Sequence, residues 1–345
     1  MSKRASFAKV SRPRLFGVVP RERLFSFLDE NHGRPLVYIS GPPGAGKTAL
    51  VASYLEDRGF PAVWYQIDAG DADPASLFHY LSVAAESLGK ASIASLPRFV
   101  PQHLSDLPGF ARLFFRAFFS QLPEGLTLVL DNYQEAPEDA ALHEILRQAI
   151  AELPPSDSVI VISRLDAPRP FIHLTASGAM AAIGWDELQL TFDEVRAIAK
   201  KRSVTDDWLL KALHQQSQGW AAGITLMLER LGHFDGKSQE LPTETRESVF
   251  NYFASLIFDQ APETTCQILL SIAFLPRVTP TLARELSGRD DAPAVLEDLY
   301  RRRMFTDRRP GTEPVYQFHA LFLDFLNGRA RQALAAGDQI GRAHV

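Results

Sequence analysis

Short apolar runs alternate with amphipathic stretches through the first half of the chain. The apolar runs predict β-strands at residues 36–39, 62–67, 126–130 and 159–163. The intervals show helical patterns, which predict helices after residue 48 and over residues 74–89, 108–121 and 138–152. Because these strands are apolar on both faces, we expect a parallel sheet that is covered by helices on both sides.

One of these helices carries a cluster of large apolar residues. Its spacing predicts a single buried face formed by Phe110, Leu113, Phe114 and Phe118. The segment before it, residues 91–107, contains Pro97 and Pro101 and is expected to be irregular.

The pattern changes after Trp185. Residues 192–232 look helical, residues 236–242 read as a polar linker, and residues 244–287 look helical again. Residues 294–330 predict a helix, a hairpin with its turn at residues 309–312, and a second helix. We find no internal repeat.

A glycine-rich motif lies between the first predicted strand and the helix that follows it. Gly41-Pro42-Pro43-Gly44-Ala45-Gly46-Lys47-Thr48 fits the pattern G-x-x-x-x-G-K-[ST] at every position. Glycines let backbone N–H groups surround phosphate oxygens, and the helix N-terminus adds a favourable dipole. We therefore expect this loop and Ala49 to bind ATP or ADP, with Lys47 at the β- and γ-phosphates and Thr48 on Mg²⁺.

Charged residues follow three of the predicted strands. Asp131 ends the strand 126–130 and is expected to hold Mg²⁺ from a strand neighbouring the phosphate loop, although such a residue is often only a turn or cap. Arg164 follows the strand 159–163 and either reaches the γ-phosphate or is a surface arginine. Asp68 belongs either to the same edge of the site or to a turn.

Composition narrows the class of protein. With 345 residues, 46% of them apolar, and a net charge of −5, the chain suits a globular protein of two or three domains and not a disordered one. The apolar run 220–228 is too short for a bilayer, and the start resembles no signal peptide. The single cysteine, Cys266, excludes an intrachain disulfide and a cysteine-rich metal site, so we expect a cytoplasmic protein.

Positive charge is concentrated in two places. Residues 1–23 contain seven Lys or Arg and one acidic residue, and we expect this arm to dock across the nucleotide. Five arginines lie between residues 301 and 309. A DNA contact there would give a steep salt dependence, but we favour a solvated hairpin or a face that docks on a partner domain.

Several motifs, in this order, resemble one family. They are residues 9–81, Val129–Gln134, Ile162–Arg164, Leu190–Val195, Ser217–Gly223 and Phe318–Leu326. Over residues 9 to about 330 the chain is similar to the ATPase module of the maltose-regulon activator and its LuxR-type relatives, which are signal-transduction ATPases with numerous domains (STAND).

The resemblance implies three domains that close around ADP and open with ATP and an inducer. The expected organisation is a basic arm (1–23), a P-loop nucleotide-binding domain (24–186), a helical domain (187–235), a winged-helix domain (236–335) and a tail (336–345). The family pattern assigns a nucleotide contact to Arg21 and sensing of the γ-phosphate to Arg164. It also places His319 at the β-phosphate of ADP, whereas by itself this histidine would be read as a core residue.

Two departures from the family pattern bear on catalysis. Asn132 and Gln134 stand where relatives often have Asp and His. An amide is no general base, but either side chain could orient water, so we expect Lys47, Asp131, Asn132 and Arg164 to support only slow hydrolysis, below about 1 s⁻¹. Gly219-Trp220-Ala221 replaces a Gly-x-Pro, and Trp220 packs either near the adenine or, as we favour, in the core.

These observations favour a nucleotide-gated switch of a transcriptional regulator, which self-associates when ATP is bound. A stand-alone ATPase or kinase, and a module that binds nucleotide without hydrolysing it, are the alternatives. Contacts with inducer and DNA are expected in C-terminal domains that this chain does not contain. Residues 340–345 resemble a translated sequencing adapter, so we expect residues 336–345 to be an artificial tail on a fragment.

Overall fold

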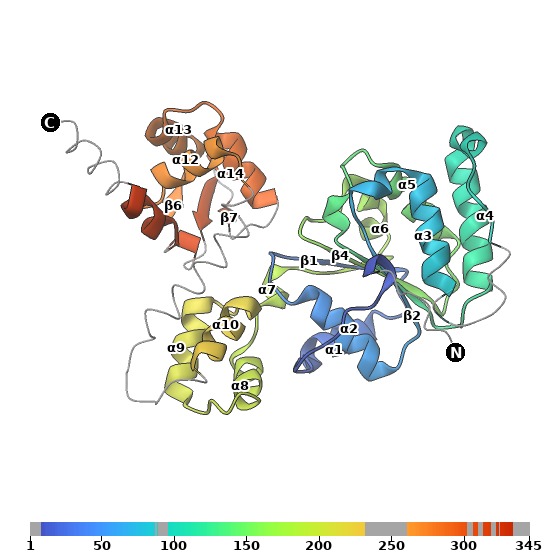
Figure 1. The fold of residues 1–345 in the computed structure, drawn as a ribbon, viewed down its shortest axis with the longest axis horizontal. Helices are drawn as coiled ribbons and strands as arrows, with labels where there is room; N and C mark the ends of the chain where they lie inside the picture. Colours follow the sequence, from blue (N-terminus) through green and yellow to red (C-terminus); the bar gives the residue numbers. More distant parts are fainter. Residues whose placement is uncertain are drawn as a thin grey trace. The chain divides into compact units, whose positions relative to one another are not determined.

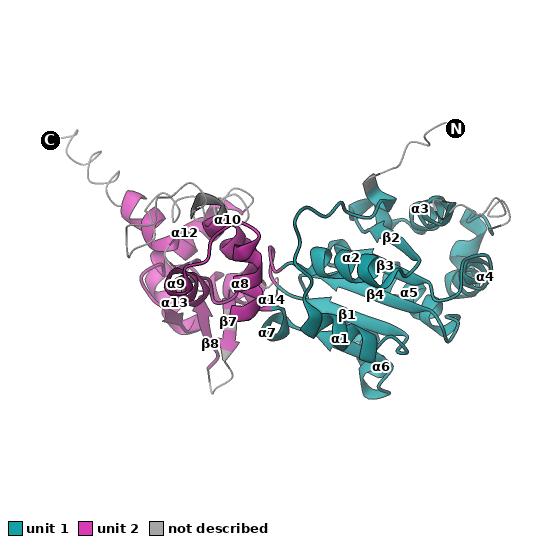
Figure 2. Ribbon diagram, turned by 90° about the horizontal axis from the view of Figure 1, so that it is seen from below, with its two compact units in different colours: residues 1–41, 46–188 teal, residues 42–45, 189–345 magenta. Residues whose placement is uncertain are grey.

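The structure of the chain is a computed structural model. It describes residues 8–86, 88, 96–231, 261–301, 306–309, 313–318, 322–323 and 325–333. These residues form two compact units, which are coloured separately in Figure 2. The first comprises residues 1–41 and 46–188, and the second comprises residues 42–45 and 189–345.

The first unit is built on a five-stranded parallel sheet (Figure 1). Its strands are β1 (Leu36–Ser40), β2 (Ala62–Gln66), β3 (Thr127–Asp131), β4 (Ser158–Ser163) and β5 (Met180–Ile183). They lie in the order β2-β3-β4-β1-β5, and every paired neighbour runs parallel. All residues of β1, β3 and β4 are buried, as their apolar sequences predict for a sheet covered on both faces.

Helices cover both faces of this sheet. They are α1 (Glu22–Glu30), α2 (Lys47–Arg58), α3 (Pro74–Glu86), α4 (Leu107–Ser120), α5 (Ala141–Ala151), α6 (Ile172–Ala176) and α7 (Trp185–Leu188). Figure 1 shows α1 and α2 on the opposite side of the sheet from α3, α4 and α5. Short 3₁₀ turns connect them, namely η1 (Ala8–Val10), η2 (Ala69–Ala72), η4 (Pro101–Asp106), η5 (Tyr133–Glu135) and η6 (Arg169–Phe171).

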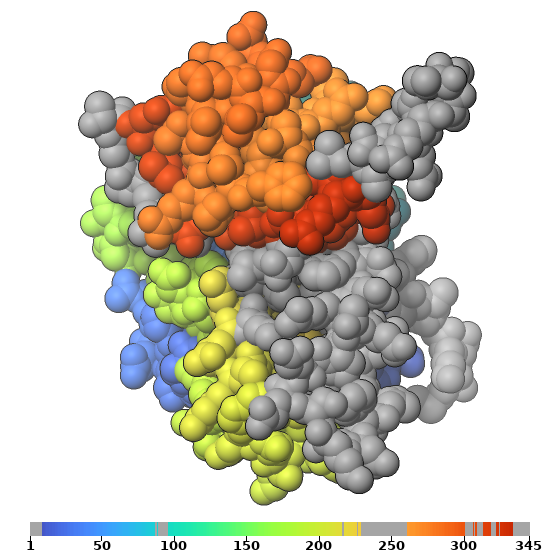
Figure 3. Space-filling view, turned by 90° about the vertical axis from the view of Figure 1, so that its left-hand side faces the viewer, coloured from blue at the N-terminus to red at the C-terminus, as the bar shows by residue number. Residues whose placement is uncertain are grey.

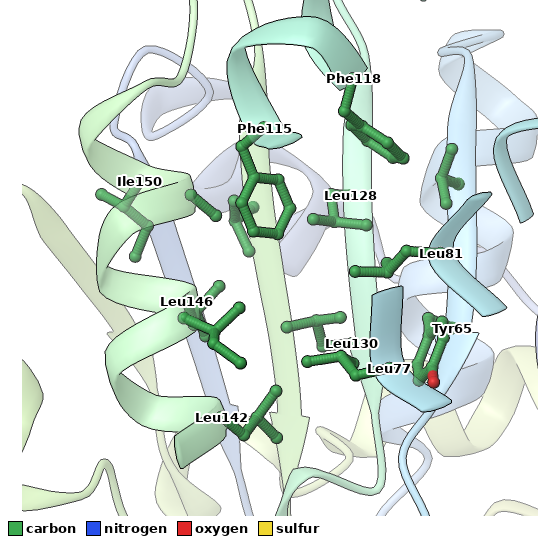
Figure 4. Packing of buried hydrophobic residues seen from close by; sticks show 14 of the residues in the cluster. Tyr65, Leu77, Leu81, Phe115, Phe118, Leu128, Leu130, Leu142, Leu146 and Ile150 are labelled. Atoms are coloured by element: carbon green, nitrogen blue, oxygen red, sulfur yellow. The ribbon is translucent and has the colours of Figure 1, made fainter. Parts of the chain in front are cut away.

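The core between the sheet and α3, α4 and α5 is rich in aromatic side chains (Figure 4). Phe110, Phe114 and Phe118 of α4 are buried as predicted. Leu113 is 57% exposed, so its predicted place on this face is wrong. Its helical neighbours Phe115 and Phe119 take that place, because α4 buries a broad stripe of phenylalanines against both α3 and α5.

Two features of the first unit differ from the sequence analysis. Strand β5 and helix α1 were not predicted; β5 is short and half alanine, a composition with little strand preference. Strand β3 is also not the direct neighbour of β1, because β4 pairs with β1 on one side and with β3 on the other. Asp131, at the end of β3, nevertheless lies beside the phosphate loop, because its Oδ2 is 3.1 Å from Thr48 Oγ1.

The second unit contains helices followed by a small antiparallel sheet. Its first helices are α8 (Phe192–Lys200), α9 (Asp207–Ser217) and α10 (Ala221–Leu231), as predicted for residues 192–232. Residues 232–260, which include the predicted linker, lie outside the described residues.

In the rest of this unit, in orange and red in Figure 3, the described residues from 292 onward have the helix and hairpin pattern predicted for residues 294–330. The prediction that residues 244–287 are helical is wrong at residues 277–278, which pair as a strand with residues 316–317. The elements of this part are α12 (Glu263–Ser271), β6 (Arg277–Val278), α13 (Pro280–Ser287), α14 (Ala292–Arg301), β7 (Thr306–Arg309), β8 (Val315–Phe318) and the helical residues 325–333. The strands form a sheet in the order β6-β8-β7. Among the described helices, none is long and apolar enough to cross a membrane.

Candidate functional site

The glycine-rich motif forms the loop between β1 and α2. Gly44 and Gly46 have φ of 73° and 83°, in the left-handed region that favours glycine. Gly46 is the N-cap of α2, which starts at Lys47, so the first turn of this helix faces the loop. The Gly41 N–H donates to Ser163 O at 3.3 Å, which ties the start of the loop to the end of β4. Such a loop at a helix N-terminus suits a phosphate group.

Lys47 lies at the centre of this arrangement. It is 8% exposed, and its Nζ donates to Gly41 O at 2.6 Å. The pKa of Lys47 is lowered to about 7, chiefly by burial and in addition by the charge of Arg164, while the Asp131 carboxylate acts in the opposite direction. A buried lysine at the start of the helix that follows this loop suits a site for a phosphate anion.

The side-chain oxygens of Thr48 and Asp131 lie next to each other. Thr48 Oγ1 lies 3.1 Å from Asp131 Oδ2 and 3.3 Å from Oδ1. Burial raises the pKa of Asp131, while the Asn132 N–H, Thr48 and Lys47 stabilise the carboxylate. In the part of the chain that the structure describes, no three His, Cys, Asp or Glu residues group together as a metal site. A Mg²⁺ ion held by Thr48 and Asp131 would therefore take further ligands from phosphate and water, as this ion usually does.

Asn132 and Gln134 follow Asp131 directly. Asn132 is in the left-handed region, with φ 60°, and precedes η5. The Gln134 side chain is engaged at both ends, because its Oε1 accepts from the Arg164 N–H at 3.0 Å and its Nε2 donates to Glu135 Oε1 at 3.1 Å. Of the two amides considered for orienting water, Asn132 is thus the better candidate.

Trp220 contacts residues of the loop that belong to the same compact unit, residues 42–45. It is fully buried, which agrees with the preferred core position, and its indole N–H donates to Pro43 O at 2.9 Å. The Ala222 N–H donates to Gly44 O at 3.0 Å. A Cβ added at Gly44 would lie 2.6 Å from Ala222 Cβ, so only glycine fits there. These two hydrogen bonds link residues 42–45 to the start of α10, in agreement with their assignment to the second unit.

The described part of the N-terminal arm docks on the first unit at several points. Lys9 Nζ binds Asp68 Oδ2 at 2.6 Å and Asp71 Oδ2 at 2.8 Å. Asp68 also caps η2 by accepting from the Gly70 N–H, which is the turn role considered for it. Arg21, 7% exposed, donates from Nη2 to Leu188 O at 3.0 Å, and Arg23 donates to Glu187 O at 2.8 Å. Arg21 thus holds the end of α7.

Two other predicted features lie wholly or partly outside the described residues. His319 lies outside the described residues. Of the basic cluster at residues 301–309, Arg302 and Arg303 also lie outside them, whereas Arg308 pairs with Glu297 at 3.3 Å.

The fold and the loop define a class of protein. A parallel sheet in the order β2-β3-β4-β1-β5, with the phosphate loop after β1 and an acidic residue at the end of β3, is a P-loop nucleotide-binding fold. In addition, residues 254–337 match the family described as the MalT winged helix domain.

The chain is similar in sequence to curated MalT-type transcriptional regulators. It is 28% identical over 343 residues to the HTH-type transcriptional regulator MalT of Vibrio cholerae, covering 94% of this chain and 37% of that protein. The MalT protein of Yersinia enterocolitica is 28% identical over 340 residues, with 95% and 37% covered. The chain thus spans little more than a third of the length of the curated relatives that it matches.

Solved structures with a similar fold include a STAND protein with a tetratricopeptide repeat sensor from Pyrococcus horikoshii. It has a TM-score of 0.45 and 19% identity, and the match covers 94% of this chain and 44% of that chain. The ORC2 protein of Aeropyrum pernix, in ADPNP and ADP complexes, has a TM-score of 0.47 and 13% identity, with 91% and 93% covered.

Proposed function

We propose that the chain is the nucleotide-binding switch module of a STAND-type transcriptional regulator. The observation that carries this proposal is the convergence of four groups on the loop between β1 and α2. Lys47 is buried in the loop, Thr48 and Asp131 pair their oxygens, and the charge of Arg164 is close enough to lower the pKa of Lys47. Together they supply a cation for the β- and γ-phosphates, two Mg²⁺ ligands and a second cation for the γ-phosphate.

Residues 41–49 would hold the phosphates of ATP or ADP through backbone N–H groups and the N-terminus of α2. Bound Mg²⁺ supplies charge neutralisation between the phosphates. Arg164 would distinguish ATP from ADP, because only ATP offers a γ-phosphate at the C-terminal edge of the sheet. We assign a nucleotide contact to Arg21 and a contact with the ADP β-phosphate to His319 on the resemblance to the family alone.

Hydrolysis would be slow, because the residue after Asp131 is an amide. Asn132 can orient a water molecule but cannot take its proton. A slow reaction suits a switch between two states. The closed state holds ADP, and the open state self-associates. ATP and an inducer would shift the chain to the open state because they bind that state more tightly. A module that binds nucleotide without hydrolysing it is the alternative, and Asn132 is compatible with both.

The proposal is tested by the nucleotide that the purified chain contains. The protein is denatured and the released nucleotide is identified by chromatography, in parallel with Lys47→Ala and with Arg116→Ala as a control on the exposed face of α4. We expect about one ADP per chain in the parent and in Arg116→Ala, and none in Lys47→Ala. A parent protein that neither retains nor binds ATP or ADP would refute the proposal.

A further inference from the structure

The Gln134 side chain bridges the ends of two strands. Gln134 belongs to η5, directly after β3, and its Oε1 accepts a hydrogen bond at 3.0 Å from the backbone N–H of Arg164, directly after β4. The two residues are 30 positions apart in the sequence. This bond fixes the peptide plane from which the Arg164 side chain extends.

The rest of the turn after β4 is held by side chains as well. The Leu165 N–H donates to Ser163 Oγ at 3.0 Å, and the Tyr38 hydroxyl donates to Leu165 O at 3.2 Å. Ser40 Oγ donates to Asp166 Oδ1 at 3.2 Å. Tyr38 and Ser40 belong to β1, so the strand before the phosphate loop holds one side of this turn and Gln134 holds the other. The backbone of Arg164 is therefore fixed relative to both the phosphate loop and the strand of Asp131.

We propose that Gln134 is a positioning residue for nucleotide discrimination. By accepting the Arg164 N–H, it directs the guanidinium toward the γ-phosphate and links its position to Asp131, three residues earlier. The carbonyl of the peptide between Ser163 and Arg164 is held by the Gly41 N–H. Without the bond to Gln134 this peptide loses the restraint on its N–H, and the guanidinium samples directions away from the phosphate. This inference rests on the proposed role of Arg164, and it assigns to Gln134 a structural contact in place of a contact with water.

The predicted signature is a selective loss of ATP affinity. A single hydrogen bond of this kind corresponds to about a 3- to 10-fold effect on the competent population. Gln134→Met keeps the length of the side chain and removes the acceptor, so we expect ATP to bind about 3- to 10-fold more weakly and ADP to change less than about 2-fold. Gln134→Glu retains an acceptor oxygen and should restore ATP binding. Glu135→Ala removes only the partner of Nε2 and should leave the ratio of the two affinities unchanged.

The experiment measures the dissociation constants of ATP and ADP by displacement of a fluorescent ADP analogue from the full chain. It uses the parent, the three variants, Arg164→Ala, and the double variant Gln134→Met/Arg164→Ala. Arg164→Ala alone should lower ATP affinity selectively, and Gln134→Met should add no further loss to it. Melting temperatures, measured without nucleotide, show whether each variant folds.

Each outcome gives a distinct answer. Equal losses of ATP and ADP affinity in Gln134→Met, or an ATP loss that persists in the Arg164→Ala background, would overturn the positioning role while the proposed function stands. If the parent binds no nucleotide, the proposed nucleotide site is refuted. If Arg164→Ala leaves the ratio of ATP to ADP affinity unchanged, the proposed sensing role of Arg164 is refuted. In either case the positioning role of Gln134 is refuted as well. If Gln134→Met does not fold, Gln134→Asn takes its place, because the shorter amide withdraws the acceptor oxygen from the Arg164 N–H. The positioning role predicts a selective loss of ATP affinity in this variant, whereas a purely structural role predicts the parental ratio together with a lower melting temperature.

Discussion

Substitution of Gly44 would change stability through two contributions, backbone strain and steric clash, and a comparison with Gly59 separates them. Gly44 has φ +73°, and an added Cβ would lie 2.6 Å from Ala222 Cβ and 3.0 Å from Trp220 Nε1. Gly59, at the end of α2, has φ +68° and nothing within 4 Å of an added Cβ. Gly44→Ala and Gly59→Ala therefore share the same backbone strain and differ in the steric clash.

The two contributions have different sizes. An alanine in the left-handed region costs about 1–2 kcal/mol, and overpacking adds about 1–3 kcal/mol. We expect Gly59→Ala to lower the free energy of unfolding by about 1–2 kcal/mol and Gly44→Ala to lower it by about 2–5 kcal/mol. Normal carbon contacts are about 3.5–4 Å, so the loop at Gly44 must move by about 1 Å. A displaced loop should lose at least about tenfold in ADP affinity, which corresponds to 1.4 kcal/mol.

The assay combines urea denaturation, followed by tryptophan fluorescence, with calorimetric titration of ADP. The double variant Gly44→Ala/Ala222→Gly removes the 2.6 Å contact and keeps the left-handed strain. It should recover the part of the packing loss that is due to Ala222, less up to about 1 kcal/mol for glycine in a helix, while the contact at 3.0 Å with Trp220 Nε1 remains. Equal effects of Gly44→Ala and Gly59→Ala on both measurements, or no recovery in the double variant, would refute the reasoning.

Three other predictions concern charged and polar groups. Because burial lowers the pKa of Lys47 to about 7 and phosphate favours its protonated form, ADP affinity should be constant below pH 7 and fall by up to about tenfold per pH unit above it. Titrations from about pH 6 to 9 check this, and Arg116→Ala, on the exposed face of α4, should keep the same dependence. Asn132→Asp places a carboxylate after Asp131 and should raise phosphate release about 10²-fold or more; an unchanged rate would contradict our explanation of slow hydrolysis. Lys9→Met leaves the buried Asp71 carboxylate without its cation and should cost about 3 kcal/mol in urea denaturation, whereas Lys9→Met with Asp71→Asn should recover most of that loss.

Several parts of the fold follow from local sequence. Strands β1 to β4 could be predicted because their residues are apolar at consecutive positions, which suits burial on both faces. The phosphate loop could be predicted because its glycines, lysine and threonine are adjacent in the chain and act through their own backbone. Helix α1 and strand β5 carry weaker local signals, and tertiary packing decides their conformation. Leu113 is a further case in which local sequence was not enough. The periodicity of α4 is compatible with burial of either of two adjacent stripes of apolar residues, and only the packing shows that Leu113 is exposed.

The sequence by itself thus determined the class of fold, the phosphate loop and the charged residues that end its strands. The tertiary structure decided which of these residues meet. Strand β4 lies between β1 and β3, and this order brings Gln134 to Arg164. Trp220 meets Pro43 across 177 residues, and Lys9 meets Asp71 across 62. Contacts between residues so far apart in the sequence depend on strand order and helix packing. The local sequence around an amide or an indole group does not show which residue it will contact.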